Sequence, residues 1–150
     1  MSIVVGSKFP EFPAPTQDGQ TVNLADYRDG SNLVVFFYPT ATTRGCVKET
    51  TEFGVRREEF DAIDTRIVGV SIDDPALQKE HQIQCAANFP LLCDTDKHLT
   101  EELGILNENG RSKRTTYLVD KSGVIARVFD GVSVDGHVDE VLAAAKALRA

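Results

Sequence analysis

The stretch Asn32–Pro39, which reads NLVVFFYP, places the strongest constraint on the fold of this chain. It contains six consecutive large apolar residues, Leu33–Tyr38, so a β-strand at this point would be apolar on both faces. Strands of this kind are typical of the buried centre of an α/β sheet. The run is far too short to cross a bilayer as a helix. The sequence therefore predicts a fully buried strand.

The segments around this strand alternate between strand-like and helix-like patterns. Strands are expected in a hairpin at Phe12–Pro15 and Thr21–Leu24 with its turn at Asp18-Gly19, at Thr65–Ile72, in FPLLCD, and in the hairpin RTTYLVDKSGVIARVF. Helices are expected at Gly45–Phe60 with anchors Val47, Phe53 and Phe60, from the Asp74 cap to about Asn88, in KHLTEELGI, and in GHVDEVLAAAKALRA. This order predicts one domain over residues 1–150 with a thioredoxin-like three-layer α/β fold, in which helices flank a central mixed β-sheet and an N-terminal hairpin is added.

Charge and cysteine content narrow the functions that need to be considered. The chain has 16 basic and 23 acidic residues, a net charge of −7, so we expect neither a nucleic-acid nor a membrane partner. Its first residues, MSIVVGSKFPEFPAP, do not resemble a signal peptide. The cysteines, at positions 46, 85 and 93, are odd in number and irregularly spaced, unlike a secreted disulfide framework or a Cys-x-x-Cys zinc site. A cytoplasmic protein is expected.

A single thiol stands where the predicted central strand gives way to a helix. In FFYPTATTRGCVKET, Cys46 would lie in the first helical turn, where unpaired backbone N–H groups and the positive end of the helix dipole favour a thiolate. Arg44 adds a positive charge, Thr43 a hydroxyl group, and Pro39 has no N–H of its own. Fixed donors at the carboxyl end of a strand can stabilise the charge that develops on a leaving oxygen when a thiolate attacks a peroxide.

The same residues resemble the active-site signature of the peroxiredoxins. Pro39-x-x-x-Thr43-x-x-Cys46 follows an aromatic strand, and RTTYLVDKSGVI, which starts at Arg114, is similar to the family's later strand with its active-site arginine. The similarity extends over nearly the whole chain, through GSKFPEFPAPTQDGQTVNLADYRDG, IVGVSIDD, FPLLCD and the closing helix in that order. The segment FYP…T.GC..E and the short C-terminus most resemble the bacterioferritin-comigratory (Q-type) branch.

The resemblance implies a role for each residue of the site. Cys46 would be the peroxidatic cysteine, Thr43 would hydrogen-bond the peroxide, Pro39 would shield the thiolate, and Arg114 would stabilise both thiolate and transition state. Glu49, one turn into the helix, resembles the acidic residue that helps to hold that arginine. The expected activity is reduction of hydrogen peroxide and organic hydroperoxides without a bound cofactor or metal. Thioredoxin or a similar dithiol protein would recycle the enzyme, as a monomer or a homodimer.

The resemblance is less definite about the thiol that resolves the sulfenic acid. Many Q-type members have a cysteine where this chain has Thr51, and others have it in the helix after the second core strand, where this chain has Cys85. Cys85 is therefore the expected resolving cysteine, and Cys93 or an external thiol are the alternatives. A disulfide needs Cα atoms about 5.5 Å apart, so we expect the helix that starts at Gly45 to unwind locally before the bridge forms.

Other interpretations of these residues are also open. Cys85 could be a buried apolar residue on one helical face with Leu77 and His81, or could bind a metal together with His81 and another cysteine. Arg114 could be part of a surface ion pair, and Thr43 could simply cap the helix. A thioredoxin-fold redox sensor or holdase without turnover is the rival function. Arg44 stands where the Q-type branch usually has proline, which leaves the preferred peroxide open.

Overall fold

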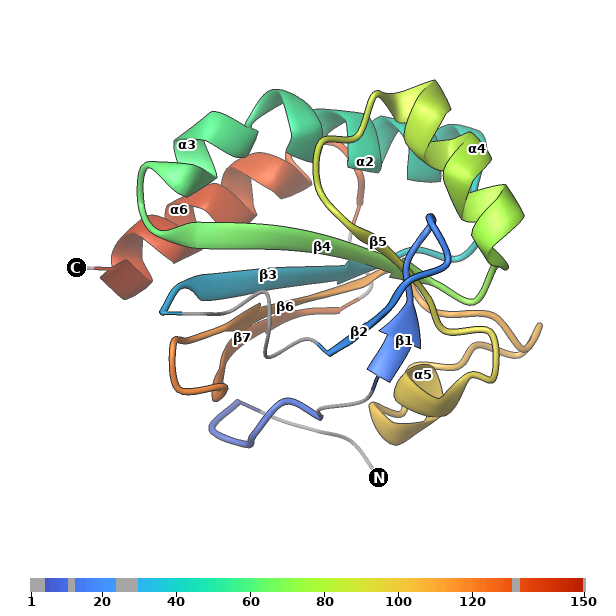
Figure 1. The fold of residues 1–150 in the computed structure, drawn as a ribbon. Coiled ribbons are helices and arrows are strands. Elements are labelled where there is room, and N and C mark those ends of the chain that lie inside the picture. Colours follow the sequence, from blue (N-terminus) through green and yellow to red (C-terminus); the bar gives the residue numbers. More distant parts are fainter. Residues whose placement is uncertain (1–4, 11–12, 24–29, 131–132, 150) are drawn as a thin grey trace.

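The computed structural model describes residues 5–10, 13–23, 30–130 and 133–149 (Figure 1). Within these ranges, five strands form one mixed sheet in the order β5-β4-β3-β6-β7, and β1 and β2 form a separate hairpin. The strands are β1 Pro13–Pro15, β2 Thr21–Asn23, β3 Asn32–Phe37, β4 Thr65–Ser71, β5 Leu91–Cys93, β6 Thr115–Val119 and β7 Ile125–Phe129. The helices are α2 Arg44–Val55, α3 Arg57–Asp61, α4 Pro75–Cys85, α5 His98–Glu102 and α6 His137–Arg149.

The sheet has β3 at its centre, and helices or the hairpin cover both faces. Strand β3 pairs in parallel with β4 and antiparallel with β6, and all of its residues are buried. Helices α2, α3, α4 and α6 cover one face, whereas α5 and the β1–β2 hairpin lie on the other (Figure 1). This arrangement confirms the buried central strand and the thioredoxin-like three-layer fold with a mixed sheet.

The side chains of β3 alternate between two apolar clusters. Val34 and Phe36 belong to the cluster under α2 and α6, and the Phe36 ring stacks on Phe53 of α2 with centroids 4.5 Å apart. Leu33, Val35 and Phe37 point into the second cluster, together with Leu99 and Leu103 at α5. The alternation follows from the two-residue period of a strand, and it explains why this strand is apolar on both faces.

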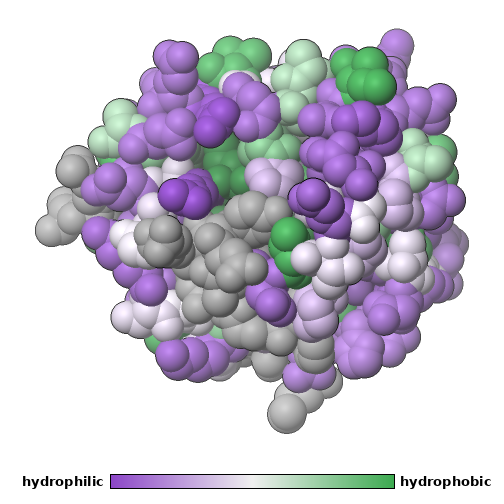
Figure 2. Space-filling model, viewed as in Figure 1, coloured by the Kyte–Doolittle hydropathy of each residue, from purple (hydrophilic) through white to green (hydrophobic). Residues whose placement is uncertain are grey.

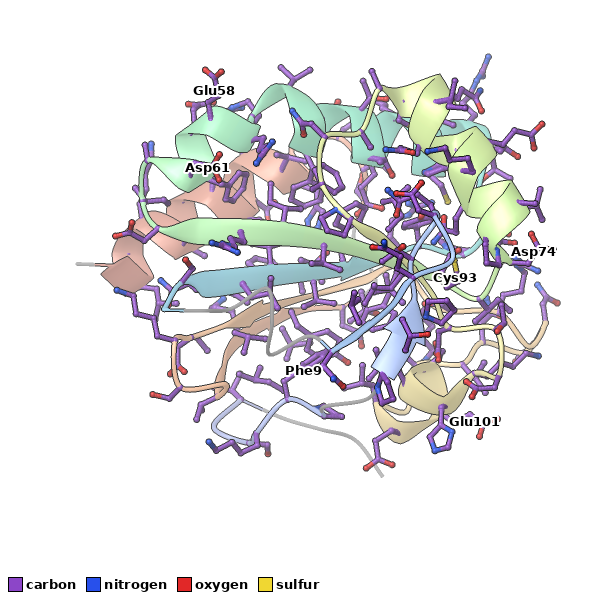
Figure 3. The ribbon with its side chains drawn as sticks, in the orientation of Figure 1. Phe9, Glu58, Asp61, Asp74, Cys93 and Glu101 are labelled. Carbon is purple, nitrogen blue, oxygen red and sulfur yellow. The ribbon has the colours of Figure 1, made fainter. Side chains whose placement is uncertain are left out.

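The N-terminal hairpin closes the edge of the sheet at β5. Its turn is at Asp18-Gly19 as predicted, with Gly19 in the left-handed region at φ +81°. The Gln17 N–H donates to the Leu91 carbonyl at 3.0 Å, and Phe9 packs edge-on against Tyr117 on the same face (Figure 3). The outer ends of the predicted hairpin strands, residues 12 and 24, lie outside the described residues.

Two predicted helices have different boundaries in the structure. The expected helix Gly45–Phe60 is broken at Arg56, where the backbone angles are φ −95° and ψ 4°. Glycine and β-branched valine directly before this residue weaken the helix, although the Arg56 N–H still donates to the Glu52 carbonyl at 3.2 Å. The Arg56 guanidinium bonds to Glu59 and Asp139. Helix α4 ends at Cys85 rather than near Asn88, because the next residue is left-handed at φ 52°.

The surface seen in Figure 2 is mostly hydrophilic, with small, separated apolar areas. Among the described residues, the large apolar side chains that are exposed are Val5, Val55, Leu77 and Ile83. No helix in the described part of the chain is both long and apolar enough to cross a bilayer.

The residues that the sequence predicts to form the active site lie at one edge of the sheet. Strands β3, β4 and β5 are parallel, so their carboxyl ends meet there. Strand β6 runs the other way, with Thr115 opposite Phe37, so the residue before β6 lies beside the loop after β3. The register therefore brings Arg114 to the start of α2, although the two segments are far apart in the sequence.

Candidate active site

Cys46 is the third residue of α2 and is 1% exposed. The first backbone bond of the helix runs from the Val47 N–H to the Thr43 carbonyl at 2.8 Å, so the N–H groups before it point out of the helix start. The Thr43 hydroxyl does not cap the helix, because it donates to the Thr40 carbonyl at 2.7 Å. Thr43 therefore occupies the N-cap position through its backbone alone, and its hydroxyl lies on the exposed side of the loop.

The Arg114 guanidinium joins Cys46 to a buried carboxylate. Its Nη2 donates to Cys46 Sγ at 3.4 Å, and its Nη1 donates to Glu49 Oε1 at 2.7 Å. Glu49 is fully buried, so this is not a surface ion pair. Gly45 leaves room for the guanidinium, because a Cβ there would lie 3.2 Å from Nη2. The result is a cation fixed beside the sulfur at the start of a helix.

A buried histidine, His137, lies next to the Glu49 carboxylate. Burial raises the pKa of Glu49 to about 7, although the positive charge of Arg114 acts in the opposite direction. Among the described residues, its Oε2 has no hydrogen-bond partner; it lies 3.7 Å from His137 Nε2, which is paired with Thr116 Oγ1 at 2.8 Å. Burial, and then the charge of Arg114, lower the pKa of His137 to about 4, so its imidazole is neutral at neutral pH.

A second ion pair fastens the loop between β3 and α2. Asp73 Oδ2 accepts the Ala41 N–H at 2.7 Å and the Ser71 hydroxyl at 2.9 Å. Arg111 binds the other oxygen of Asp73 and donates through Nε to the Pro39 carbonyl at 2.7 Å. Neither Asp73 nor Arg111 was predicted from the sequence to belong to the site. The only signal for Asp73 was its place directly after a strand that ends at this edge.

His81 of α4 is a buried residue of this region rather than a metal ligand. Its Nδ1 accepts the Thr42 N–H at 2.7 Å, and its ring stacks on Tyr38 at 4.8 Å. Burial lowers the pKa of His81 to about 4, although the charge of Asp73 opposes the shift. Leu77, expected on the same buried face, is 40% exposed, and the buried position one residue later is Gln78. No group of three or more His, Cys, Asp or Glu in the described ranges could hold a metal ion.

The other two cysteines are buried and unbridged. Cys85 lies on α4 where that helix packs against α2, and its Sγ is 3.7 Å from the Val47 carbonyl. Burial raises the pKa of Cys85 above its usual range. Cys93 ends β5 near Asp74 (Figure 3), and burial followed by the charges of Asp74 and Asp73 raises its pKa to about 12.

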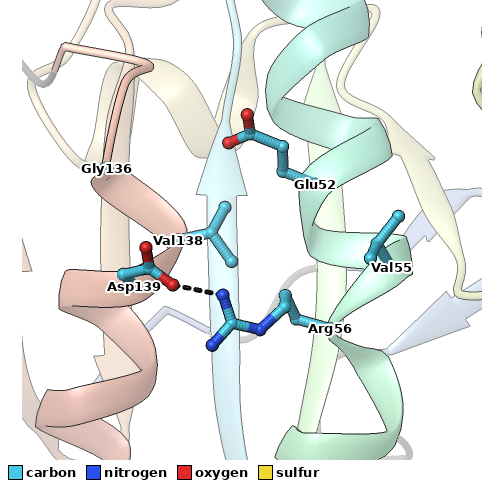
Figure 4. A pocket seen from close by; sticks show the side chains of 6 residues that line it. All are labelled: Glu52, Val55, Arg56, Gly136, Val138 and Asp139. Carbon is cyan, nitrogen blue, oxygen red and sulfur yellow. Dashed lines mark hydrogen bonds and ion pairs between the residues drawn. The ribbon is translucent and has the colours of Figure 1, made fainter.

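A groove of about 290 Å³ lies between α2 and α6 (Figure 4). An ion pair between Arg56 and Asp139 crosses it. It is lined by Glu52, Val55, Arg56, Gly136, Val138 and Asp139. Since no cysteine is among these residues, the groove is separate from the thiol site.

Known proteins share both the sequence pattern and the fold. The AhpC/TSA family model matches residues 5–128. Peroxiredoxin Bcp of Escherichia coli K12 is 32% identical over 144 residues, which cover 91% of this chain and 92% of that protein. The crystal structure of peroxidoxin BcpB from Mycobacterium tuberculosis has a TM-score of 0.90 at 30% identity and covers 97% and 98% of the two chains. The bacterioferritin comigratory protein of Xanthomonas campestris has a TM-score of 0.86 at 29% identity and covers 93% and 92%.

Proposed function

The chain belongs to the AhpC/TSA family of peroxiredoxins, in its Bcp or Q-type branch, and we propose that its catalytic cycle uses Cys46 and then Cys85. As a member of this family it is a thiol peroxidase with a peroxidatic cysteine. The observation that carries the assignment to Cys46 is the bridging guanidinium of Arg114. Of the three buried thiols, Cys46 has this cation 3.4 Å from its sulfur.

In the first step, the Cys46 thiolate attacks the outer oxygen of the peroxide. The O–O bond breaks, the sulfur becomes a sulfenic acid, and the remaining oxygen leaves as an alcohol or water after it takes up a proton. Arg114 favours the thiolate and stabilises the charge on the leaving oxygen. The Thr43 hydroxyl turns to the peroxide, and Pro39, whose carbonyl is held by Arg111, shields the sulfur.

In the second step, Cys85 attacks the sulfenic acid and forms an intramolecular disulfide. The contact between Cys85 Sγ and the Val47 carbonyl, at 3.7 Å, supports this assignment, because Val47 directly follows Cys46 in α2. Both cysteines lie on helices, so the first turn of α2 must unwind before the two sulfurs meet. Cys93 and an external thiol remain the alternative resolving groups.

Substrate and reductant belong to the same proposal. Hydrogen peroxide and organic hydroperoxides are the proposed substrates, and the alkyl peroxide reduction activity described for the Xanthomonas campestris relative supports the second class. A dithiol protein such as thioredoxin would reduce the disulfide, in a cytoplasm that keeps thiols reduced. The site is proposed to work without a bound cofactor.

Intact-mass spectrometry without reductant, after one equivalent of hydrogen peroxide, tests this cycle. The native chain is expected to lose about two mass units as one disulfide forms, whereas Cys85→Ser should gain about 16 units as a sulfenic acid. Cys93→Ala serves as the matched control and should behave like the native chain.

The other outcomes each point to a different mechanism. Gain of oxygen in the native chain would establish one-cysteine chemistry with an external thiol. Loss of about two units in Cys85→Ser but not in Cys93→Ala would move the bridge to Cys93. No change in any of the three proteins would contradict a peroxidase that uses these thiols.

A further inference from the structure

One imidazole contacts the three parts of the molecule that the proposed cycle must coordinate. His81 is fully buried on α4 and stacks on Tyr38, which precedes the active-site loop. Its Nδ1 accepts the backbone N–H of Thr42 in that loop at 2.7 Å. Its Nε2 lies 2.9 Å from Thr50 Oγ1, one turn after Cys46 in α2, and 3.7 Å from Cys85 Sγ.

The contact with the loop fixes which ring nitrogen carries the proton. A backbone N–H can only donate, so Nδ1 of His81 must accept, and the proton of the neutral ring is on Nε2. Burial lowers the pKa of this imidazole to about 4, so the ring stays neutral over the physiological range. Nε2–H is therefore a permanent hydrogen-bond donor that points toward Thr50 and Cys85.

The loop contact also holds an unfavourable backbone conformation. Thr42 has φ +68°, in the left-handed region that a β-branched residue rarely adopts. Its N–H bond to His81 and the adjacent bond from the Ala41 N–H to Asp73 hold the loop in this shape. Loss of the Nδ1 acceptor should let the loop relax and should therefore affect the peroxide step.

The surroundings of Cys85 mostly disfavour a negative charge on its sulfur. Burial is the main cause that raises its pKa, and the charge on Cys46 acts in the same direction. A hydrogen bond from Thr51 opposes the shift. His81 Nε2–H is within donor range of the sulfur, and a hydrogen bond to a charged acceptor is about twice as strong as one between neutral groups. The donor is thus shared with Thr50 while Cys85 is a thiol and turns to the sulfur as charge develops.

We propose that His81 is a positioning residue for the resolving step: Nδ1 holds the loop that leads to Cys46, and Nε2–H stabilises the Cys85 sulfur as it becomes a thiolate. In this step Cys85 gives up its proton and attacks the sulfenic sulfur of Cys46. The S–O bond breaks, the S–S bond forms, and the departing hydroxide takes up that proton and leaves as water. The Cys85 sulfur is oxidised, the Cys46 sulfur is reduced, and His81 keeps its own proton. The inference rests on the proposed function, because it assigns a helper to the Cys85 step.

Two substitutions separate the two nitrogens. In His81→Asn the amide oxygen can replace Nδ1, and the donor near Cys85 is lost. In His81→Gln the amide nitrogen can replace Nε2–H, and the acceptor for Thr42 is lost. His81→Phe keeps the ring stack on Tyr38 and removes both nitrogens. The chain has no tryptophan, so the two steps are timed by rapid quench, with dimedone to trap the sulfenic acid and intact mass to count disulfides.

A crossed pattern of rates is expected. His81→Asn should form the sulfenic acid within about twofold of the native rate but should form the disulfide about tenfold more slowly. His81→Gln should slow sulfenic acid formation and keep disulfide formation within about threefold of the native rate. His81→Phe should slow both steps.

If both steps are slowed equally in His81→Asn and in His81→Gln, His81 has only a structural role and the inference is overturned. A native rate of disulfide formation in His81→Asn would overturn it as well. Folding is checked by far-ultraviolet circular dichroism. If His81→Asn does not fold, His81→Gln must still resolve about tenfold faster than His81→Phe, or the inference fails.

Failure of the proposed function would give a different result from failure of this inference alone. In that case the native chain itself gains oxygen and forms no disulfide, which removes the step that His81 is said to assist and overturns the inference as well. Failure of the inference alone leaves the native disulfide in place and shows only in the rates of the variants.

Discussion

Cys46 and Cys85 lie on neighbouring helices, α2 and α4, that cover the same face of the sheet, and both thiols are almost fully buried. Their surroundings differ in charge. Cys46 has the Arg114 guanidinium 3.4 Å away, paired in turn with the buried Glu49. Cys85 has a backbone carbonyl and a neutral imidazole, each 3.7 Å from its sulfur.

The difference concerns how each site treats a buried negative charge on sulfur. Removal from water disfavours the charged form, and this is the main reason why the pKa of Cys85 is raised. A permanent cation such as Arg114 works against that cost, whereas a neutral donor such as His81 does so more weakly. In the proposed cycle this suits both roles. The first thiol must attack peroxide as a thiolate, and the second must stay unreactive until a sulfenic acid is present.

Removal of the first nucleophile should have the largest effect. Cys46→Ser is expected to lower the second-order rate of hydrogen peroxide consumption by at least about a thousandfold. Cys85→Ser, measured in excess dithiothreitol so that an external thiol resolves the sulfenic acid, should stay within about threefold of the native rate. Substantial peroxidase activity in Cys46→Ser would break the comparison, since Cys85 or Cys93 would then have to react with peroxide directly.

The next largest effect should come from the cation. Arg114→Met is expected to slow sulfenic acid formation about a hundredfold, the size seen when one fixed donor to a developing charge is removed. Arg114→Lys keeps a charge but cannot reach Glu49 and Cys46 at once, so a smaller loss is expected. Stopped reactions trapped with dimedone measure this step.

The matched control for Arg114 is Arg57→Met. Arg57 is a partly exposed residue of α3 that pairs with Asp61, and its removal should leave the rate unchanged. If Arg114→Met keeps the native rate within about threefold, the start of α2 alone is sufficient and the charge contrast between the two thiols is not what separates them.

The pH dependence of disulfide formation tests whether ionisation of Cys85 limits this step. The pKa of Cys85 is raised above its usual range, so its thiolate fraction is small at neutral pH and grows as pH rises. Disulfide formation is therefore expected to accelerate about tenfold per unit between about pH 6 and pH 8. Acid quench and intact mass measure the rate. A flat profile would mean that unwinding of α2, rather than ionisation of Cys85, limits the step.

Local patterns in the sequence were sufficient for most of the fold. The apolar run of β3, the Asp18-Gly19 turn and the Asp74-Pro75 start of α4 each depend on residues that are neighbours in the chain, and each is confirmed. The break at Arg56 was missed. Gly54 and Val55, directly before it, are poor helix formers, but such residues also occur inside unbroken helices, so they did not predict the break.

Some polar contacts of the candidate site were likewise predicted from the sequence, and others were missed. Cys46 and Arg114 were found because the resemblance places both in known motifs, and the β3–β6 register brings them together. The contact of His81 with Thr42 and that of His137 with Glu49 each depend on how two distant elements pack and on side-chain orientation. His81 was considered only as a core residue or a metal ligand, since its spacing to Cys85 says nothing about a loop 39 residues earlier.

Substitution of the third cysteine, Cys93, should have the smallest effect on the reaction rates. Cys93 is as buried as Cys46, at 1% exposure, but carboxylates rather than a guanidinium are nearby, and its pKa is raised to about 12. Such a thiol cannot supply a thiolate near neutral pH, so Cys93→Ala is expected to change both the peroxide and the disulfide rates by less than about twofold. Rapid quench of the two steps checks this. Loss of the disulfide in Cys93→Ala would instead show that a buried thiol beside two aspartates can resolve a sulfenic acid. In that case the charges around a thiol would not determine which cysteine reacts.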